Sequence, residues 1–238
     1  MKKIFLLIFA FVLLIGTMTG CGNKINSRIP AIAGYINNNA ELVEEIEYEK
    51  GKQLRLFEDH LEFDKNKILY NDIEIIRYSS NTYSYADTSG CSSSSYFVEY
   101  TFVLSNGDKH KIKCGGSNFF SATVDDETKL AVNTFVNVVY TNVARSVAQR
   151  AYNQISNGDE LNIAGLTVNS DEAIGKNNTP INIYNYGKCE FSGENIRIIS
   201  KNGEELFRVK QTEDNADLLK MRITSKNKKR QTAKIMIK

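Results

Sequence analysis

The side chains best suited to chemistry in this chain are four cysteines and two histidines. A thiol beside an imidazole makes a nucleophile, because the imidazole takes the proton from sulfur. His110 and Cys114 stand four residues apart in a strand-like run, so they share a face but lie roughly 13 Å apart, beyond hydrogen-bonding reach. His60, in the turn-like sequence 58–60, is expected to be a solvated turn residue. The sequence therefore predicts no Cys–His nucleophile.

Metal, acid–base and phosphate chemistry lack a signature as well. Two isolated histidines without CxxC or HxxxH spacing predict no metal site. Carboxylates are plentiful, but none stands at a spacing that implies a glycosidase pair. The acidic stretch 125–127 is typical of helix capping, and the glycine-rich stretch 114–118 lacks the lysine and helix start of a phosphate loop. We expect no catalytic residues and no cofactor.

The cysteines leave two alternatives open. If the chain is exported, a disulfide between Cys91 and Cys114 would close a loop of about 22 residues and contribute roughly 3 kcal/mol. With Cys21 placed in a leader sequence, Cys189 remains as an odd third thiol, which argues against a full disulfide framework. Free, partly buried cysteines are the alternative.

A segment rich in serine and tyrosine is the best local indication of a binding role. The segment, residues 78–96, holds eight serines and four tyrosines: Tyr78, Tyr83, Tyr85 and Tyr96. Tyrosine and serine suit adaptable contact surfaces, and functional residues concentrate on loops. The sequence predicts an inserted, exposed binding loop over 79–95; a mobile insertion without function is the alternative.

The first residues have the pattern of an export signal. Two lysines precede an unbroken apolar run from Ile4 to Ile15, and small or flexible residues lead to Cys21. Twelve residues rise only about 18 Å as a helix, which is too short for a hydrocarbon core of roughly 30 Å. The run is therefore the apolar region of a signal peptide over 1–20 rather than a stable membrane span.

The sequence Met18-Thr19-Gly20-Cys21 resembles the lipobox of bacterial lipoproteins. The resemblance implies a thioether-linked diacylglycerol on Cys21, and two acyl chains make a firm anchor to the lipid bilayer. It implies a location on the extracytoplasmic face of the cell membrane. An ordinary signal peptide with an accidental cysteine and an uncleaved anchor are the alternatives.

The charge distribution is uneven. Of 30 basic residues, two precede Cys21 and six lie in the acid-free tail 226–238, which leaves 22 basic against 28 acidic residues for the body 21–225. A mildly acidic body argues against nucleic acid as a partner. The basic tail suits anionic lipid headgroups or wall polymers, although a frayed, solvated terminus is the simpler interpretation.

The pattern of the body predicts two β-rich lobes around one helix. We expect a tether over 21–51, in whose acidic stretch a short helical turn capped by Asn39 leads into a strand, and lobes over 52–157 and 158–225. Valine and phenylalanine recur every three or four residues over 127–156, which predicts a long helix that Asp125 or Asp126 caps and Gly158 ends. A shorter helix is expected over 215–224.

Two Asn-Gly pairs, at 106–107 and 202–203, predict β-hairpins with type I′ turns. Each follows a similar order of strands and precedes a helix, which indicates an internal repeat. This order resembles the pleckstrin-homology-like fold, in which a small antiparallel sheet or open barrel is closed by a C-terminal helix. The fold class is α+β, and the resemblance implies surfaces for lipids, peptides or other domains rather than one activity.

Three functions follow from these observations. The first is a membrane-anchored, extracytoplasmic lipoprotein with a non-enzymatic binding or scaffolding role at the cell envelope, whose partner is an envelope protein or a wall polymer. The second is an envelope hydrolase with acid and base residues scattered along the sequence. The third is a lipoprotein that receives a solute, which requires a pocket between the lobes.

Overall fold

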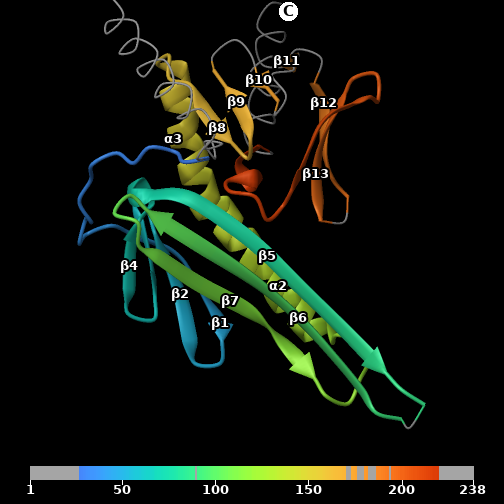
Figure 1. Ribbon diagram of the computed structural model, residues 1–238. Helices are drawn as coiled ribbons and strands as arrows, with labels where there is room; N and C mark the ends of the chain where they lie inside the picture. Colours follow the sequence, from blue (N-terminus) through green and yellow to red (C-terminus); the bar gives the residue numbers. More distant parts are fainter. Residues whose placement is uncertain are drawn as a thin grey trace, which may run out of the picture.

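The computed structural model describes residues 27–88, 90–169, 173–175, 180–181, 186–192 and 194–219 (Figure 1). The leader with Cys21, the end of the second predicted helix and the basic tail lie outside these residues. The described chain forms four antiparallel sheets and one long helix, which confirms the α+β class.

Seven strands precede the long helix and form two meanders in sequence order. The first sheet contains β1 (Leu42–Glu49), β2 (Lys52–Phe57), β3 (His60–Phe63) and β4 (Asn66–Leu69). A short 3-10 turn, η1 (Tyr70–Asp72), leads to the second sheet, which contains β5 (Ile73–Ala86), β6 (Ser92–Leu104) and β7 (Lys109–Asn118). Leu54 and Leu56 form the buried face of β2, and Leu61 and Phe63 lie buried in β3.

The acidic stretch 41–49 is not the helical turn that the sequence suggested. It forms strand β1, which pairs with β2 in the first sheet. Its glutamates at 45, 47 and 49 alternate with Ile46 and Tyr48, so a period of two places the apolar residues on the core side. Part of the predicted tether thus belongs to the fold, and Ile29, fully buried, also docks on β5 through its backbone.

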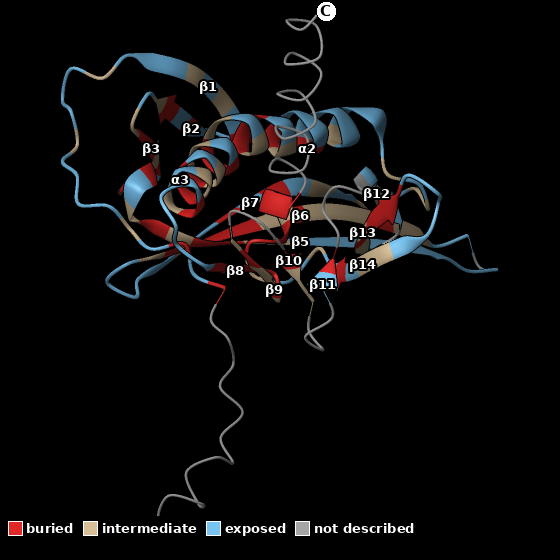
Figure 2. Cartoon of the chain, turned by 90° about the horizontal axis from the view of Figure 1, so that it is seen from above, coloured by how far each residue is buried: buried red, intermediate tan, exposed pale blue. Residues whose placement is uncertain are grey.

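The long helix is confirmed, with one local irregularity. It consists of α2 (Asp126–Val139), a π-helical segment η2 (Tyr140–Ala144) and α3 (Arg145–Ser156). The Asp125 side chain caps it by accepting the Thr128 N–H at 2.6 Å, and Gly158 follows its end with φ of +102°. Figure 2 shows the helix along one face of the β5–β6–β7 sheet, where its apolar stripe is buried.

The second half repeats the order of the first. A four-stranded meander contains β8 (Leu161–Ile163), β9 (Leu166–Val168), β10 (Ala173–Ile174) and β11 (Pro180–Ile181). A three-stranded meander contains β12 (Tyr186–Ser192), β13 (Asn195–Ser200) and β14 (Glu205–Lys210). Residues 216–219 then begin a helix. In the part of the chain described, a sheet of four, a sheet of three and a helix therefore occur twice.

Both Asn-Gly pairs join antiparallel strands, but not in the predicted type I′ turn. Only the glycine of each pair has positive φ, +90° at Gly107 and +86° at Gly203. The Gly107 N–H donates to the carbonyl of Leu104 at 2.9 Å. Each turn is therefore a three-residue loop that ends in a left-handed glycine, the next most common hairpin geometry.

The two lobes share one apolar core, to which the long helix also contributes. A buried asparagine joins them at the edge of β5. Asn215 exchanges backbone and side-chain hydrogen bonds with Ile76, and its amide also donates to the carbonyls of Ser27 and Glu74. Beside it, Arg77 forms an ion pair with Asp214 at 2.5 Å. These contacts fix the second lobe against the first.

Candidate functional site

The serine- and tyrosine-rich segment is a strand hairpin rather than the predicted loop. The register of β5 with β6 continues unbroken from Ile75 to the pair Ala86–Ser92. Asp87 closes the turn, because its side chain accepts the Cys91 N–H at 3.0 Å. Tyrosine and threonine have high strand propensity, and here pairing outweighs the serine content that suggested a loop. In Figure 1 the hairpin projects away from the second lobe to a free tip.

The four tyrosines of the predicted site divide between two faces of this sheet. Tyr78 and Tyr96 are partly buried against the core on the helix side. Side chains alternate along a strand, and Tyr83 and Tyr85 are an odd number of residues from Tyr78 on β5, so they point to the outer face of the sheet. There, 52% of the surface of Tyr83 and 43% of that of Tyr85 is exposed. The structure therefore does not bring the four side chains into one site.

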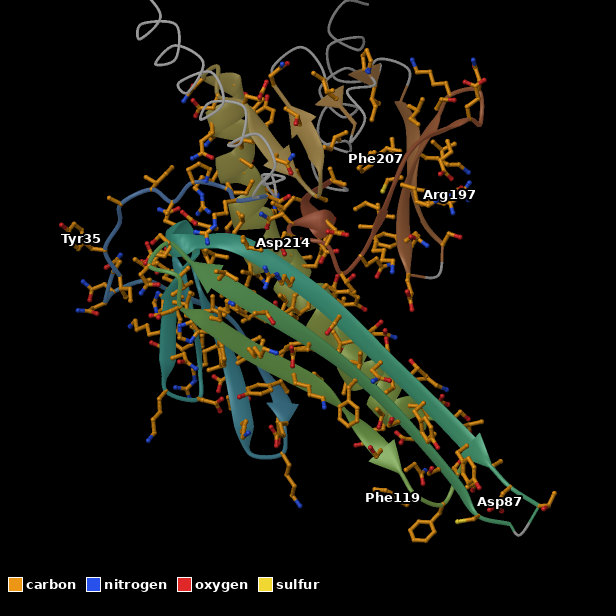
Figure 3. All side chains as sticks on the ribbon, in the orientation of Figure 1. Tyr35, Asp87, Phe119, Arg197, Phe207 and Asp214 are labelled. Carbon is orange, nitrogen blue, oxygen red and sulfur yellow. The ribbon has the colours of Figure 1, made fainter. Side chains whose placement is uncertain are left out.

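Exposed aromatic residues gather at the tip of the hairpin. Ser84 of β5 pairs with Ser94 of β6, and Ser94 pairs with Asn118, the last residue of β7. Phe119 follows Asn118 and begins a loop at the level of Tyr83 and Tyr85, the neighbours of Ser84 on β5. The Ser84 hydroxyl donates to the carbonyl of Ala122 and ties this loop to β5. We call the side chains of Tyr83, Tyr85, Phe119 and Phe120 the tip aromatic surface. Phe119 is 73% exposed and Phe120 95% (Figure 3).

Cationic residues continue this surface along the outer face of the sheet. Lys109, Lys111 and Lys113 alternate on β7 and are exposed. Lys111 pairs with Glu99 of β6 at 2.9 Å, and the Lys113 ammonium lies 3.8 Å above the ring of Phe97. The face opposite the helix thus presents aromatic, hydroxyl and ammonium groups to solvent.

A second concave site lies between the lobes, and we call it the interlobe cleft. Its volume is about 220 Å³. The sheet, the helix and the second lobe each contribute to its lining, which includes Tyr78, Tyr100, Asn137, Tyr140, Phe191 and Asp217. Asn133, Asn137 and Tyr140 fall on one helical stripe, which adjoins the buried stripe and faces the second lobe.

Burial raises the pKa of the phenols that line the interlobe cleft. Burial raises the pKa of Tyr100 well above its ordinary value, and the charge of Asp217 and a hydrogen bond to it raise it further. Burial raises the pKa of Tyr140 to about 12, again with a contribution from Asp217. The pKa of Tyr78 is raised by burial, with a smaller contribution from the same carboxylate. All three phenols therefore stay neutral at physiological pH.

His60 is not the solvated turn residue expected from the sequence. Only 1% of its surface is exposed, and its ring stacks on Phe57 with centroids 4.3 Å apart. Its Nδ1 lies 2.5 Å from Asp59 and its Nε2 3.5 Å from Glu62. Apolar packing against Phe57 explains the burial. In contrast to a surface turn, His60 begins strand β3.

Of the two alternatives for the cysteines, the structure shows free thiols rather than a bridge between Cys91 and Cys114. Cys91, Cys114 and Cys189 are free. Cys114 of β7 pairs with Val98 in the middle of β6, whereas Cys91 lies in the turn just before Ser92, the first residue of β6. Seven residues of strand separate the two by roughly 23 Å, whereas a disulfide needs Cα atoms within about 7 Å. Burial raises the pKa of Cys114 to about 11, so this thiol is a poor nucleophile.

Two further findings apply to the described residues alone. Within them, no group of three or more His, Cys, Asp or Glu side chains could hold a metal ion. None of the helices found in this part of the chain has the length and apolarity that crossing a bilayer requires.

Comparison with protein-family models, curated proteins and solved structures finds no match to this chain.

Sequence reasoning missed the interlobe cleft. A local signal existed, since Asn133, Asn137 and Tyr140 place polar and aromatic groups beside the apolar stripe of the helix. The other walls come from residues 78 and 100, earlier in the chain, and from residues 191, 211 and 217, later in the chain, and no pattern in the sequence relates these positions.

Proposed function

We propose that this chain is a lipoprotein of the cell envelope, anchored on the extracytoplasmic face of the membrane through diacylglycerol on Cys21. The support is the sequence of the leader: a cationic start, a short apolar run and the lipobox-like residues 18–21. Two acyl chains suffice for stable anchoring. The role is non-enzymatic binding or scaffolding.

The tip aromatic surface is the observation that carries the binding role. Large contiguous apolar side chains on a soluble domain commonly mark a site of interaction. Here Tyr83 and Tyr85 lie on a hairpin that extends roughly 33 Å beyond Ile76 at the joint between the lobes, and Phe119 and Phe120 lie in the loop that follows β7. A projecting aromatic tip suits contact with an envelope protein, and the lysines beside it suit an acidic partner. A wall polymer is the alternative partner.

The repeated order of a four-stranded sheet, a three-stranded sheet and a helix supports a tandem pleckstrin-homology-like arrangement. In this proposal each half is an open barrel that its C-terminal helix closes. Folds of this kind present surfaces rather than catalytic centres, which is consistent with a scaffold.

The anchor is tested by growing cells that express the full chain with a fatty acid carrying a clickable tag. The native chain should incorporate the tag and remain with the membrane fraction. The variant Cys21→Ser should lose both properties, whereas the control Cys91→Ser should keep them. An unlabelled native chain, or a labelled Cys21→Ser chain, would contradict the anchor.

The binding role is tested by crosslinking in the same cells. The double variant Phe119→Ser/Phe120→Ser should lose the crosslinked species of the native chain. Leu130→Ser is the matched control, because Leu130 is a 68% exposed apolar residue on the helix outside the tip. Equal crosslinking in both variants would show that the tip aromatic surface does not bind the partner.

A second function, reception of a solute, is favoured by one observation, the interlobe cleft. A pocket between lobes is the feature that this function requires. It is compatible with the anchor, since a tethered lipoprotein holds a captured solute near the membrane.

A further inference from the structure

Strand β5 lies at one edge of the sheet that it forms with β6 and β7 (Figure 1). Its start is covered by Ile29 and Asn215, whose backbone N–H groups donate to carbonyls of the strand. Beyond this joint every residue from Ser79 to Ala86 is exposed, and within the described residues no other strand pairs with β5 on that side. We call residues 79–86 the open edge.

The alternation of the strand identifies the backbone groups that face the open edge. Ile76 donates its N–H to the side chain of Asn215 and accepts the Asn215 N–H at its carbonyl, so both groups point away from β6. Along an antiparallel strand, every second residue has this orientation. The pairing with β6 is unbroken from Ile75 to Ala86, so no bulge changes it. The residues of the open edge that share it are Ser80, Thr82, Ser84 and Ala86.

The sequence of the open edge suits pairing with an identical strand. Residues 79–86 contain no charged residue, no proline and no glycine. Charged side chains, proline and bulges are the usual means by which an edge strand avoids pairing with another chain. Because no side chain here carries a charge, two copies of this strand do not repel each other when they lie side by side.

We propose that the open edge of β5 pairs with the open edge of a second copy of this chain, in an antiparallel ladder whose two-fold axis passes beside Tyr83. In this register the backbone of Ser80 faces that of Ala86 of the partner subunit, and Thr82 faces Ser84 of the partner subunit. Each such pair exchanges two hydrogen bonds, so the ladder contains about eight. This number is within the range of about 10 ± 5 that a typical interface contains.

The side chains at the axis support this register. Tyr83 alternates with the residues that bond across the open edge, so the two copies of its ring lie opposite each other in a pair without backbone hydrogen bonds. Side chains in such a pair approach closely, and an aromatic pair across two strands is stabilising. A two-fold ladder uses the open edge of both copies at once, so assembly ends at a dimer.

The oligomeric state of the full chain in a maltoside detergent provides the first test. Light scattering during size-exclusion chromatography should give a protein mass of two chains, which falls to one chain on dilution. A single chain at every concentration would overturn the proposal. Assemblies that keep growing with concentration would also overturn it, because a closed two-fold pair cannot grow.

A proline at the open edge tests the backbone ladder. The N–H of Thr82 points away from β6, so Thr82→Pro removes no hydrogen bond within the sheet, and edge strands tolerate proline at such positions. This variant should raise the dissociation constant of the dimer at least about tenfold. Thr82→Val is the matched control, since it changes the same side chain and keeps the N–H, and its dimer should dissociate within about twofold of the native value. Equal dimerisation of both variants would place the interface elsewhere and overturn the proposal.

A charge exchange at Tyr83 tests the position of the axis and does not depend on the fold of the proline variant. Tyr83→Lys and Tyr83→Glu each place like charges opposite each other, so each alone should dimerise less than the native chain. An equimolar mixture at low salt should form a mixed dimer at least about threefold more tightly than either variant alone. A mixture that dimerises no better than its components would contradict the axis at Tyr83.

A strand of a different protein is the other occupant that these experiments detect. If the isolated chain is a single copy, and Thr82→Pro removes a crosslink to another envelope protein in cells, the open edge receives that protein and the pairing of two copies is overturned. The inference goes beyond the proposed function and uses neither Cys21 nor the exposed phenylalanines. Its failure therefore leaves the lipid anchor and the tip aromatic surface to be judged by their own tests.

Discussion

At the residue scale, burial shifts the pKa values of two ionisable side chains, Arg150 and Cys114. Arg150 on the helix is buried, and its guanidinium donates to three backbone carbonyls, those of Tyr70, Ile73 and Ile29. Burial lowers the pKa of this guanidinium to about 10, which still leaves it charged at neutral pH. The arginine therefore joins the helix to the first lobe and to the docked segment at residue 29.

Replacing Arg150 should destabilise the protein. Arg150→Leu leaves three buried carbonyls without their donor, and we expect the free energy of unfolding to fall by about 3 kcal/mol. Urea denaturation followed by circular dichroism measures the change. Arg145→Leu removes an arginine from an exposed position of the same helix and should change stability by less than about 0.5 kcal/mol. Similar losses in both variants would contradict the role assigned to Arg150.

The free cysteines should differ in reactivity. Cys91 lies exposed in the hairpin turn, whereas Cys114 is buried and burial raises its pKa to about 11. In the native protein at pH 8, a maleimide should modify Cys91 within minutes and leave Cys114 unmodified until urea is added. Mass spectrometry of digested peptides follows both sites. Rapid modification of Cys114, or a peptide in which both thiols are oxidised to one disulfide, would contradict the arrangement.

At the element scale, ion pairs tie neighbouring strands of the second lobe. Glu205 of β14 accepts hydrogen bonds from Arg208 and Arg197, each with one contact of 2.7 Å. The contact with Arg208 and then that with Arg197 lower the pKa of Glu205 from 4.5 to about 2. A lowered carboxyl pKa means that the folded state binds the proton less tightly than the unfolded state.

The stability that Glu205 contributes should therefore depend on acid pH. It is fully present above about pH 4.5 and is lost as pH falls towards 2. The stability difference between the native chain and Glu205→Gln should shrink over this window, and it should be smaller in 1 M salt, because the site is partly exposed. Urea titrations at several pH values measure it, with Glu204→Gln at the adjacent turn as the control. A constant difference across the window would refute the assignment.

At the scale of the whole molecule, the described parts of the two halves share one apolar core. Their apolar residues form a single core around the long helix, and the edge of β5 is covered by Asn215 and the segment at 27–29. An uncovered strand edge exposes unpaired backbone groups, so this cover protects the start of β5, at residues 74–76, from intermolecular pairing.

Unfolding in urea should accordingly be one cooperative transition for both halves. Asn215→Ala removes three buried side-chain hydrogen bonds from the joint and a residue type suited to its φ of +60°. We expect a loss of about 2–4 kcal/mol and a second transition, seen when circular dichroism and tyrosine fluorescence no longer coincide. Asn215→Gly, which restores the backbone freedom alone, should recover only a small part of the loss. Two transitions in the native chain would contradict a shared core.

Periodicity in the sequence determined the main elements of this fold. The apolar spacing over 127–156 predicted the helix, and Asp125 and Gly158 predicted its ends, because capping and helical period depend on residues close in sequence. The Asn-Gly pairs predicted both hairpins for the same reason. The leader sequence alone supports the lipid anchor, which stays a prediction.

Tertiary structure decided what the local pattern left open. The serine-rich segment became strand because β6 offers a partner along its whole length, and its period of two then sent Tyr83 and Tyr85 outwards and Tyr78 and Tyr96 inwards. Cys91 and Cys114 were separated by that same extension. The interlobe cleft exists only because the second lobe docks through Asn215 and brings Asp217 to Tyr78 and Tyr140. Contacts between residues more than 60 positions apart depend on how the lobes pack, and the sequence near each residue carries no information about that packing.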